Sequence, residues 1–161
     1  DDMYGGSYRL FERVRRRSAG LTFSYVDMTN PKNLLAALRP ETRMVFVETI
    51  ANPCTQVADL EGIGALCRCH GLLYVVDNTI TTPYLFRPQS VGASLTINSL
   101  TKYIGGHGNA LGGAVTAEHQ MGMTVNQARR DQPPFKVNLI RMIYRDVSFR
   151  NQRKDFLAAY N

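Results

Sequence analysis

Three short and nearly continuous apolar runs constrain the fold of this chain more than any other feature of its sequence. They are residues 44–47 (MVFV), 72–76 (LLYVV) and 94–98 (SLTIN). Runs of this length without polar alternation are typical of strands that are covered on both faces, whereas a buried helix needs about ten residues or more. The runs therefore predict the inner strands of a largely parallel sheet.

Helical patterns lie in front of these runs and between them. Asn30 and Pro31 supply an N-cap and a first-turn proline for a helix that Pro40 stops. A second helix has Asp59 as its N-cap and is ended by Gly71. A third helix is expected over residues 5–18, with its arginines on the solvent side.

Two further segments have strand character. Residues 21–27 (LTFSYVD) alternate and are rich in β-forming side chains, and residues 112–116 (GGAVT) form a short run. Strands that alternate with helices over short connections predict a three-layer α/β domain.

Composition supports a soluble globular protein. The chain has 161 residues, of which 44% are hydrophobic and 20% charged, so neither a disordered nor a fibrous class is needed. No apolar run reaches the roughly 18 residues of a membrane helix. The opening sequence DDMY does not resemble a signal peptide, and we expect a cytoplasmic protein without a membrane partner.

The three cysteines do not predict a disulfide or a metal site. Cys67 and Cys69 have the wrong spacing for a zinc or thioredoxin-type pair, and Cys54 stands alone. They are best interpreted as reduced core or surface thiols.

The net charge of +6 is concentrated in one part of the chain. Residues 1–118 hold 11 Lys/Arg against 10 Asp/Glu, whereas residues 119–161 hold 8 against 3. We expect residues 119–161 to form a basic helical tail of uncertain origin, which packs on the domain, binds an acidic partner or is not the natural continuation of the domain. The nearly neutral body gives no reason to expect nucleic-acid binding.

Polar residues follow the apolar runs, where the carboxyl ends of parallel strands would form a ligand-binding rim. Those residues are Glu48, Asn52, Asp77, Thr79, Ser99, Thr101 and Lys102. Lys102 alone is better explained as a surface lysine. Asp77, however, ends an apolar run, where an unpaired carboxylate would be costly. A protonated pyridine nitrogen would suit Asp77, and a partly desolvated Lys102 could form a Schiff base, as pyridoxal-phosphate chemistry requires.

Four motifs follow one another along residues 1–118: YGGSYRLF at 4–11, VET…NP at 47–53, VVDNT at 75–79 and SLTKYIGGH at 99–107. In order and spacing they resemble the Cys/Met-metabolism family of pyridoxal-phosphate (PLP) enzymes. The resemblance implies an incomplete large domain of the aspartate aminotransferase-like fold (fold type I), with residues 1–118 as its central part.

The resemblance also implies roles for individual residues. Lys102 would hold pyridoxal 5′-phosphate through its amine and move protons during catalysis. Asp77 would pair with the pyridine nitrogen. Tyr4 would stack on the ring and help proton transfer, Asn52 would lie near the ring's 3-hydroxyl, and Thr79 would pack on the opposite ring face.

The same resemblance implies that the hydroxyls of Ser99 and Thr101 bind the phosphate. On an extended segment these two hydroxyls would lie on the same side. Glu48 could orient neighbouring backbone or substrate. His107 is better interpreted as a support for its glycine-rich turn than as a catalytic group.

The sequence also departs from the family pattern. Ser94 stands where members usually have an acidic residue, and Leu100 where they have a small one. The family's Tyr-x-Arg phosphate clamp, its Gly-Met turn and the arginine of its C-terminal domain are not identifiable in the sequence.

The function implied by the resemblance is γ-replacement on an O-acylhomoserine with a thiol or sulfide, as in cystathionine γ-synthase or O-acylhomoserine sulfhydrylase. The first alternative is a cystathionine or methionine γ-lyase. An alternative of another class is a non-catalytic remnant or partial chain that acts as a binding module. Family active sites form between subunits, so a homo-oligomer, a tetramer or dimer of dimers, is expected to act on a small amino-acid substrate.

Overall fold

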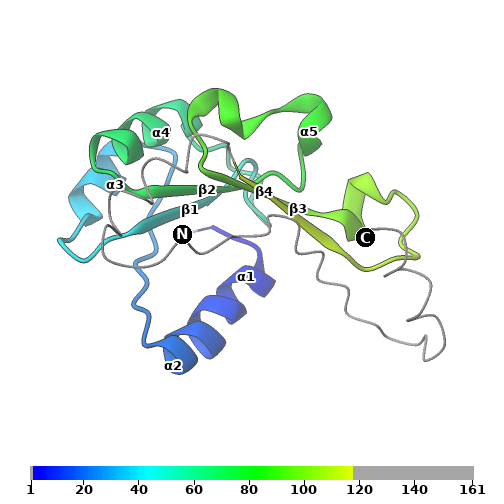
Figure 1. Cartoon of the computed structure of the whole chain (residues 1–161), viewed down its shortest axis with the longest axis horizontal. Helices are drawn as coiled ribbons and strands as arrows, with labels where there is room; N and C mark the ends of the chain where they lie inside the picture. The colour runs from blue at the N-terminus through cyan, green and yellow to red at the C-terminus, as the bar shows by residue number, and fades with distance from the viewer. Residues whose placement is uncertain (1, 118–161) are drawn as a thin grey trace, which may run out of the picture.

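A four-stranded mixed sheet forms the centre of the protein. The computed structural model describes residues 2–117, so the predicted basic tail lies outside the described residues. The sheet has the order β1-β2-β3-β4 (Figure 1). Its strands are β1 (Met44–Glu48), β2 (Leu73–Asp77), β3 (Leu95–Ser99) and β4 (Gly113–Ala117). The three apolar runs and the segment at 112–116 are thus confirmed as strands, within one residue of their predicted bounds.

The register of the sheet aligns the carboxyl ends of the parallel strands. Glu48 of β1 lies opposite Asp77 of β2, and Asp77 lies opposite Ile97 of β3. β4 runs antiparallel to β3 and pairs Gly113 with Ser99. Residues that follow β1, β2 and β3 therefore leave the sheet along the same edge.

Two helices cover one face of the sheet. They are α3 (Pro31–Ala37) and α4 (Leu60–Cys69) (Figure 1). The Asn30 side chain accepts a hydrogen bond from the Lys32 N–H at 3.0 Å, and Asp59 accepts one from the Gly62 N–H at 2.9 Å. Both N-caps inferred from the sequence are confirmed.

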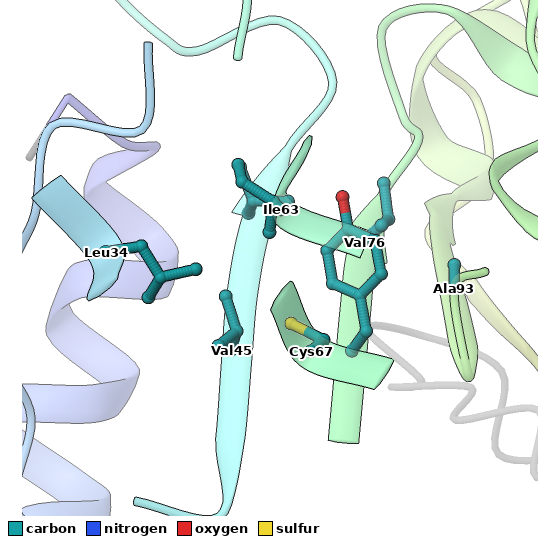
Figure 2. Packing of buried hydrophobic residues seen from close by; sticks show 8 residues of the cluster. Leu34, Val45, Ile63, Cys67, Val76 and Ala93 are labelled. Carbon is teal, nitrogen blue, oxygen red and sulfur yellow. The ribbon is translucent and has the colours of Figure 1, made fainter. Parts of the chain in front are cut away.

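The core lies between this helical face and the sheet. Figure 2 shows side chains of α3, α4, β1 and β2 directed into one space. The buried cluster consists of Leu34, Val45, Val47, Ile63, Cys67, Tyr74, Val76 and Ala93. Burial of apolar surface at about 25 cal/mol per Å² makes this cluster the main source of stability for the described residues.

A third layer lies on the opposite face. The segments α1 (Gly5–Arg9), η1 (Leu10–Arg15) and α2 (Arg16–Ala19) form one uninterrupted helical stretch, in agreement with the helix predicted over 5–18. Phe11 packs edge-on against Phe46 of β1, with ring centroids 5.1 Å apart. The predicted three-layer α/β arrangement is confirmed (Figure 1).

The predicted strand at 21–27 is wrong. This segment has no assigned helix or strand, and β1, at the edge of the described sheet, pairs with β2 alone. A strand is stable only when a neighbouring strand satisfies its backbone, and alternation alone does not supply that neighbour. Instead, the Phe23 ring stacks on the Phe11 ring, with centroids 5.2 Å apart. Residues 20–26 and β1 line a cavity of about 530 Å³.

Short elements fill the connections between strands. α5 (Thr82–Leu85) follows β2 and η3 (Leu100–Ile104) follows β3, both after the carboxyl end of a strand, whereas η2 (Pro88–Val91) precedes the amino end of β3. Across residues 2–117, no helix is long and apolar enough to cross a membrane.

Candidate active site

Three strand ends bring the candidate residues together. Glu48 ends β1, Asp77 ends β2 and Ser99 ends β3, and the parallel register places these ends side by side. The sequence separates Glu48 from Ser99 by about fifty positions. The sheet therefore creates the rim that was predicted from the polar residues after each apolar run.

The Asp77 carboxylate is held by the turn that follows it. The Thr79 N–H donates to Asp77 Oδ1 at 3.0 Å, and the Thr79 hydroxyl donates to the same oxygen at 2.5 Å. Within residues 2–117, no group donates a hydrogen bond to Oδ2 of this carboxylate. The turn thus fixes one oxygen and leaves the other able to accept a hydrogen bond from a ligand.

Thr79 also joins two strand ends. Its hydroxyl oxygen accepts a hydrogen bond from the Ser99 N–H at 2.8 Å while its proton is donated to Asp77. The sequence predicts Thr79 as a residue that packs on a ligand ring. In the structure its hydroxyl is already committed to Asp77 and Ser99, which leaves the methyl group for such a contact.

Glu48 makes a second set of contacts at the end of β1. Its Oε1 accepts a hydrogen bond from the Tyr4 N–H at 2.8 Å, and its Oε2 accepts one from the Asn52 N–H at 3.2 Å. The residue is 8% exposed. Burial, with a smaller contribution from the charge of Asp77, raises the pKa of the Glu48 carboxyl, which the two N–H donors partly oppose.

The Tyr4 ring lies over the first turn of α1. A Cβ atom at Gly6 would overlap the Tyr4 ring, so only glycine leaves the ring its place. The tyrosine is 48% exposed, and Asn52 is also exposed. Both side chains therefore remain accessible beside the buried carboxylate that holds their backbone.

The segment after β3 differs from the extended one that the sequence suggested. η3 begins at Leu100, so Ser99 and Thr101 do not alternate along a strand. The Thr101 hydroxyl oxygen accepts a hydrogen bond from the Gly112 N–H at 3.0 Å, and the Gly112 carbonyl accepts one from the Leu100 N–H at 2.9 Å. The segment after β3 is therefore a helical turn that is hydrogen-bonded to Gly112, and not an extended strand.

Lys102 lies within that turn, at a point where the backbone is not helical (φ −92°, ψ −124°). Its side chain is exposed, as for the surface lysine that the residue by itself suggests and unlike the partly desolvated lysine considered for a Schiff base. The glycines around His107 explain its turn, because Gly106 (φ +74°) and Gly108 (φ +65°) both adopt the left-handed conformation.

One polar network at the rim was not identified from the sequence. The hydroxyls of Thr49 and Thr81 lie 2.9 Å apart, and Thr81 donates to the Asn78 side chain at 2.5 Å. Asn78 is fully buried and donates to the Phe86 carbonyl at 2.9 Å. The polar run that follows β2 was a usable signal, because a buried amide requires partners.

Among residues 2–117, no group of three or more His, Cys, Asp or Glu side chains is arranged so that it could hold a metal ion.

Comparisons with known proteins give one consistent result. A family model described as Cys/Met metabolism PLP-dependent enzyme matches residues 1–135. The chain is 45% identical over 115 residues to a probable cystathionine gamma-synthase of Herpetosiphon aurantiacus, covering 71% of this chain and 36% of that protein. It is 47% identical over 119 residues to a cystathionine gamma-synthase/O-acetylhomoserine (thiol)-lyase of Bacillus subtilis, covering 74% and 32%.

Lyases match to a similar extent. A cystathionine beta-lyase of Coxiella burnetii is 44% identical over 113 residues, covering 70% of this chain and 29% of that protein. The solved structure of cystathionine gamma-lyase from Lactobacillus plantarum, complexed with L-serine, superposes with a TM-score of 0.72 at 33% identity. That match covers 78% of this chain and 33% of the lyase. The chain thus spans about a third of the length of the relatives that it matches.

Proposed function

Because the chain belongs to the Cys/Met metabolism family of PLP-dependent enzymes, we propose that residues 1–118 are the central part of a large domain that binds pyridoxal 5′-phosphate. The whole protein then catalyses γ-replacement on an O-acylhomoserine with a thiol or sulfide. The fold is that of the fold type I large domain, in agreement with the structural relative.

The observation that carries this proposal is the state of Asp77. One carboxylate oxygen is fixed by Thr79, and the other has no donor within residues 2–117. A carboxylate held in this way fits the charged N–H of a pyridine ring and would keep it protonated. With that nitrogen protonated, the bound cofactor supplies an electron sink for carbanions at the substrate's Cα and Cβ.

The other rim residues fit the remaining parts of the cofactor. The exposed Tyr4 ring would stack on the pyridine ring, Asn52 would lie near the 3-hydroxyl, and the Thr79 methyl would face the opposite side. Ser99 and Thr101 would bind the phosphate. Thr101 would turn its hydroxyl proton from the Gly112 carbonyl to the phosphate while still accepting a hydrogen bond from the Gly112 N–H. Lys102 would hold the cofactor through its exposed amine and, once released, carry protons between substrate carbons.

A lyase is the second candidate, and the relatives favour it as directly as the first. A cystathionine beta-lyase matches this chain at 44% identity, close to the synthases, and a solved gamma-lyase structure matches it at 33%. Elimination and replacement need the same Asp77 and Lys102 and differ in which substrates reach them. We further propose a homo-oligomer in the cytoplasm that takes an amino-acid substrate.

Covalent labelling tests the cofactor site. The full chain is treated with pyridoxal 5′-phosphate, reduced with borohydride and mapped by mass spectrometry. We expect the label at Lys102, its loss in Lys102→Ala, and its retention in the control Lys32→Ala, which removes another exposed lysine. Absence of label at Lys102, or equal labelling of Lys32, would show that the chain does not bind the cofactor as proposed and would favour a non-catalytic binding module.

Product analysis tests the reaction. A full-length protein that contains this chain is given O-acylhomoserine with sulfide, then with cysteine, and then cystathionine alone. We expect γ-replacement products in the first two reactions. Release of 2-oxobutyrate from cystathionine without γ-replacement would select the lyase instead.

A further inference from the structure

We propose that Glu48 is a positioning residue for the cofactor site, because its carboxylate fixes the backbone from which the Tyr4 ring and the Asn52 amide project. The role toward the cofactor rests on the proposed function, in which these two side chains contact the pyridine ring. The fixing of the backbone itself rests on the structure alone.

The two oxygens of Glu48 serve two different segments. Oε1 accepts from the Tyr4 N–H at 2.8 Å, across 44 positions of sequence, and Oε2 accepts from the Asn52 N–H at 3.2 Å in the turn after β1. The carboxylate therefore joins the start of α1, the end of β1 and the turn that carries Asn52. No backbone hydrogen bond among the described residues joins Tyr4 directly to Asn52.

An ionised carboxylate suits both bonds best. Two N–H donors need two acceptors, and the ionised group offers a charged acceptor on each of its two oxygens, whereas protonation would leave one oxygen only a weak acceptor. A glutamine of the same size offers one acceptor and turns an NH₂ group toward the second donor. A neutral side chain of equal volume would thus release one of the two segments.

A carboxylate at the position of Glu48 would destabilise the folded protein if it had no such role. It is 8% exposed, it lies opposite the like-charged Asp77 in the sheet register, and no lysine, arginine or histidine of residues 2–117 forms an ion pair with it. A buried carboxylate without a cation is stable only where hydrogen bonds replace its hydration. The Tyr4 and Asn52 amides are the groups that do so.

The hydrogen bond from the Tyr4 N–H to Glu48 also determines where the Tyr4 ring lies. Tyr4 is the N-cap residue of α1, and its own side chain makes no capping hydrogen bond. Its N–H is held by Glu48 on one side, and its ring rests on Gly6 on the other. Release of the N–H would let this first turn shift, and the ring would shift with it.

Amide hydrogen exchange on the full chain without cofactor tests the bonds directly. In Glu48→Gln we expect exchange at the amides of Tyr4, Asn52 or both to accelerate roughly 10- to 100-fold, the effect of losing a hydrogen bond to a charged group. Amides of β2 and α4 should be unchanged. The matched control is Glu41→Gln, which alters an exposed glutamate in the same way. Unchanged exchange at both positions would overturn the proposal, and faster exchange throughout the chain would reduce Glu48 to a general structural role.

A double-mutant cycle on cofactor affinity tests positioning. We expect Glu48→Gln to weaken pyridoxal 5′-phosphate binding about tenfold, and to have little further effect when Tyr4 and Asn52 are both replaced by alanine. Equal weakening in both backgrounds would overturn the positioning role. Failure of Lys102 labelling in the unaltered chain would instead overturn the proposed function, and the amide exchange result would still stand on its own.

Discussion

At the scale of the residue, Cys67 shows how burial changes chemistry. Its side chain is 1% exposed and belongs to the core cluster between α4 and the sheet (Figure 2). Burial raises the pKa of the thiol to about 11. Because the thiolate is the reactive form, this cysteine is inert near neutral pH. Cys54 and Cys69 are exposed.

Thiol labelling checks this difference. At neutral pH we expect a maleimide to modify Cys54 and Cys69 in the folded chain and to leave Cys67 unmodified until denaturant is added. Peptide mapping by mass spectrometry identifies the sites. Modification of Cys67 at the rate of the other two, before unfolding, would contradict the buried position of its side chain.

At the scale of the element, Gly64 determines how closely α4 approaches the chain before β3. A Cβ atom at this position would overlap the carbonyl oxygen of Val91, which belongs to η2. Alanine normally stabilises a helix relative to glycine by about 0.5–1 kcal/mol. Here the backbone contact reverses that preference, because the obstructing atom cannot move without shifting η2.

We therefore expect Gly64→Ala to lower the free energy of unfolding by about 1–3 kcal/mol. Cys69→Ala, an exposed substitution in the last turn of the same helix, should change it by less than about 0.5 kcal/mol. Urea unfolding followed by circular dichroism measures both. A stabilised Gly64→Ala variant would mean that α4 and η2 do not pack as closely as described.

At the scale of the whole molecule, weak acids with raised pKa values make the stability of the fold depend on alkaline pH. Burial raises the pKa of Cys67 from 9.0 to about 11, and partial desolvation with a hydrogen bond to Glu12 raises the pKa of the partly exposed Tyr25 from 10.0 to about 12. Burial also raises the pKa of Tyr74. Above pH 9 the unfolded chain loses these protons before the folded chain does, so stability falls as pH rises.

We expect the free energy of unfolding to decrease between pH 9 and about pH 11, by on the order of 1–3 kcal/mol from Cys67. Denaturant titrations at pH values below 9 and near 10 measure the decrease. In Cys67→Ala the chain is less stable throughout, but the part of the slope due to the thiol should disappear. Stability that rises with pH over this window would contradict the direction of these pKa shifts.

Much of the fold could be predicted from local patterns. The runs that became β1, β2 and β3 and the N-caps Asn30 and Asp59 all depend on side-chain periodicity and short-range hydrogen bonds. Residues 21–27 show the limit, since a strand also needs a neighbour with which to pair. η3 shows it again, because Leu100 and Thr101 at its start donate hydrogen bonds to the Gly112 carbonyl, outside the segment in which an extended strand was expected.

The same division holds for the candidate site. By itself the sequence determined the residue types at the strand ends, among them Asp77, Ser99 and Lys102, because apolar runs and the polar residues that follow them are local signals. Two of the bonds among them are local, those of Thr79 with Asp77 and of Glu48 with Asn52. Only the tertiary structure decided the other two, which join Thr79 to Ser99 across 20 positions and Glu48 to Tyr4 across 44. Their partners are set by strand register and burial, which no local pattern encodes.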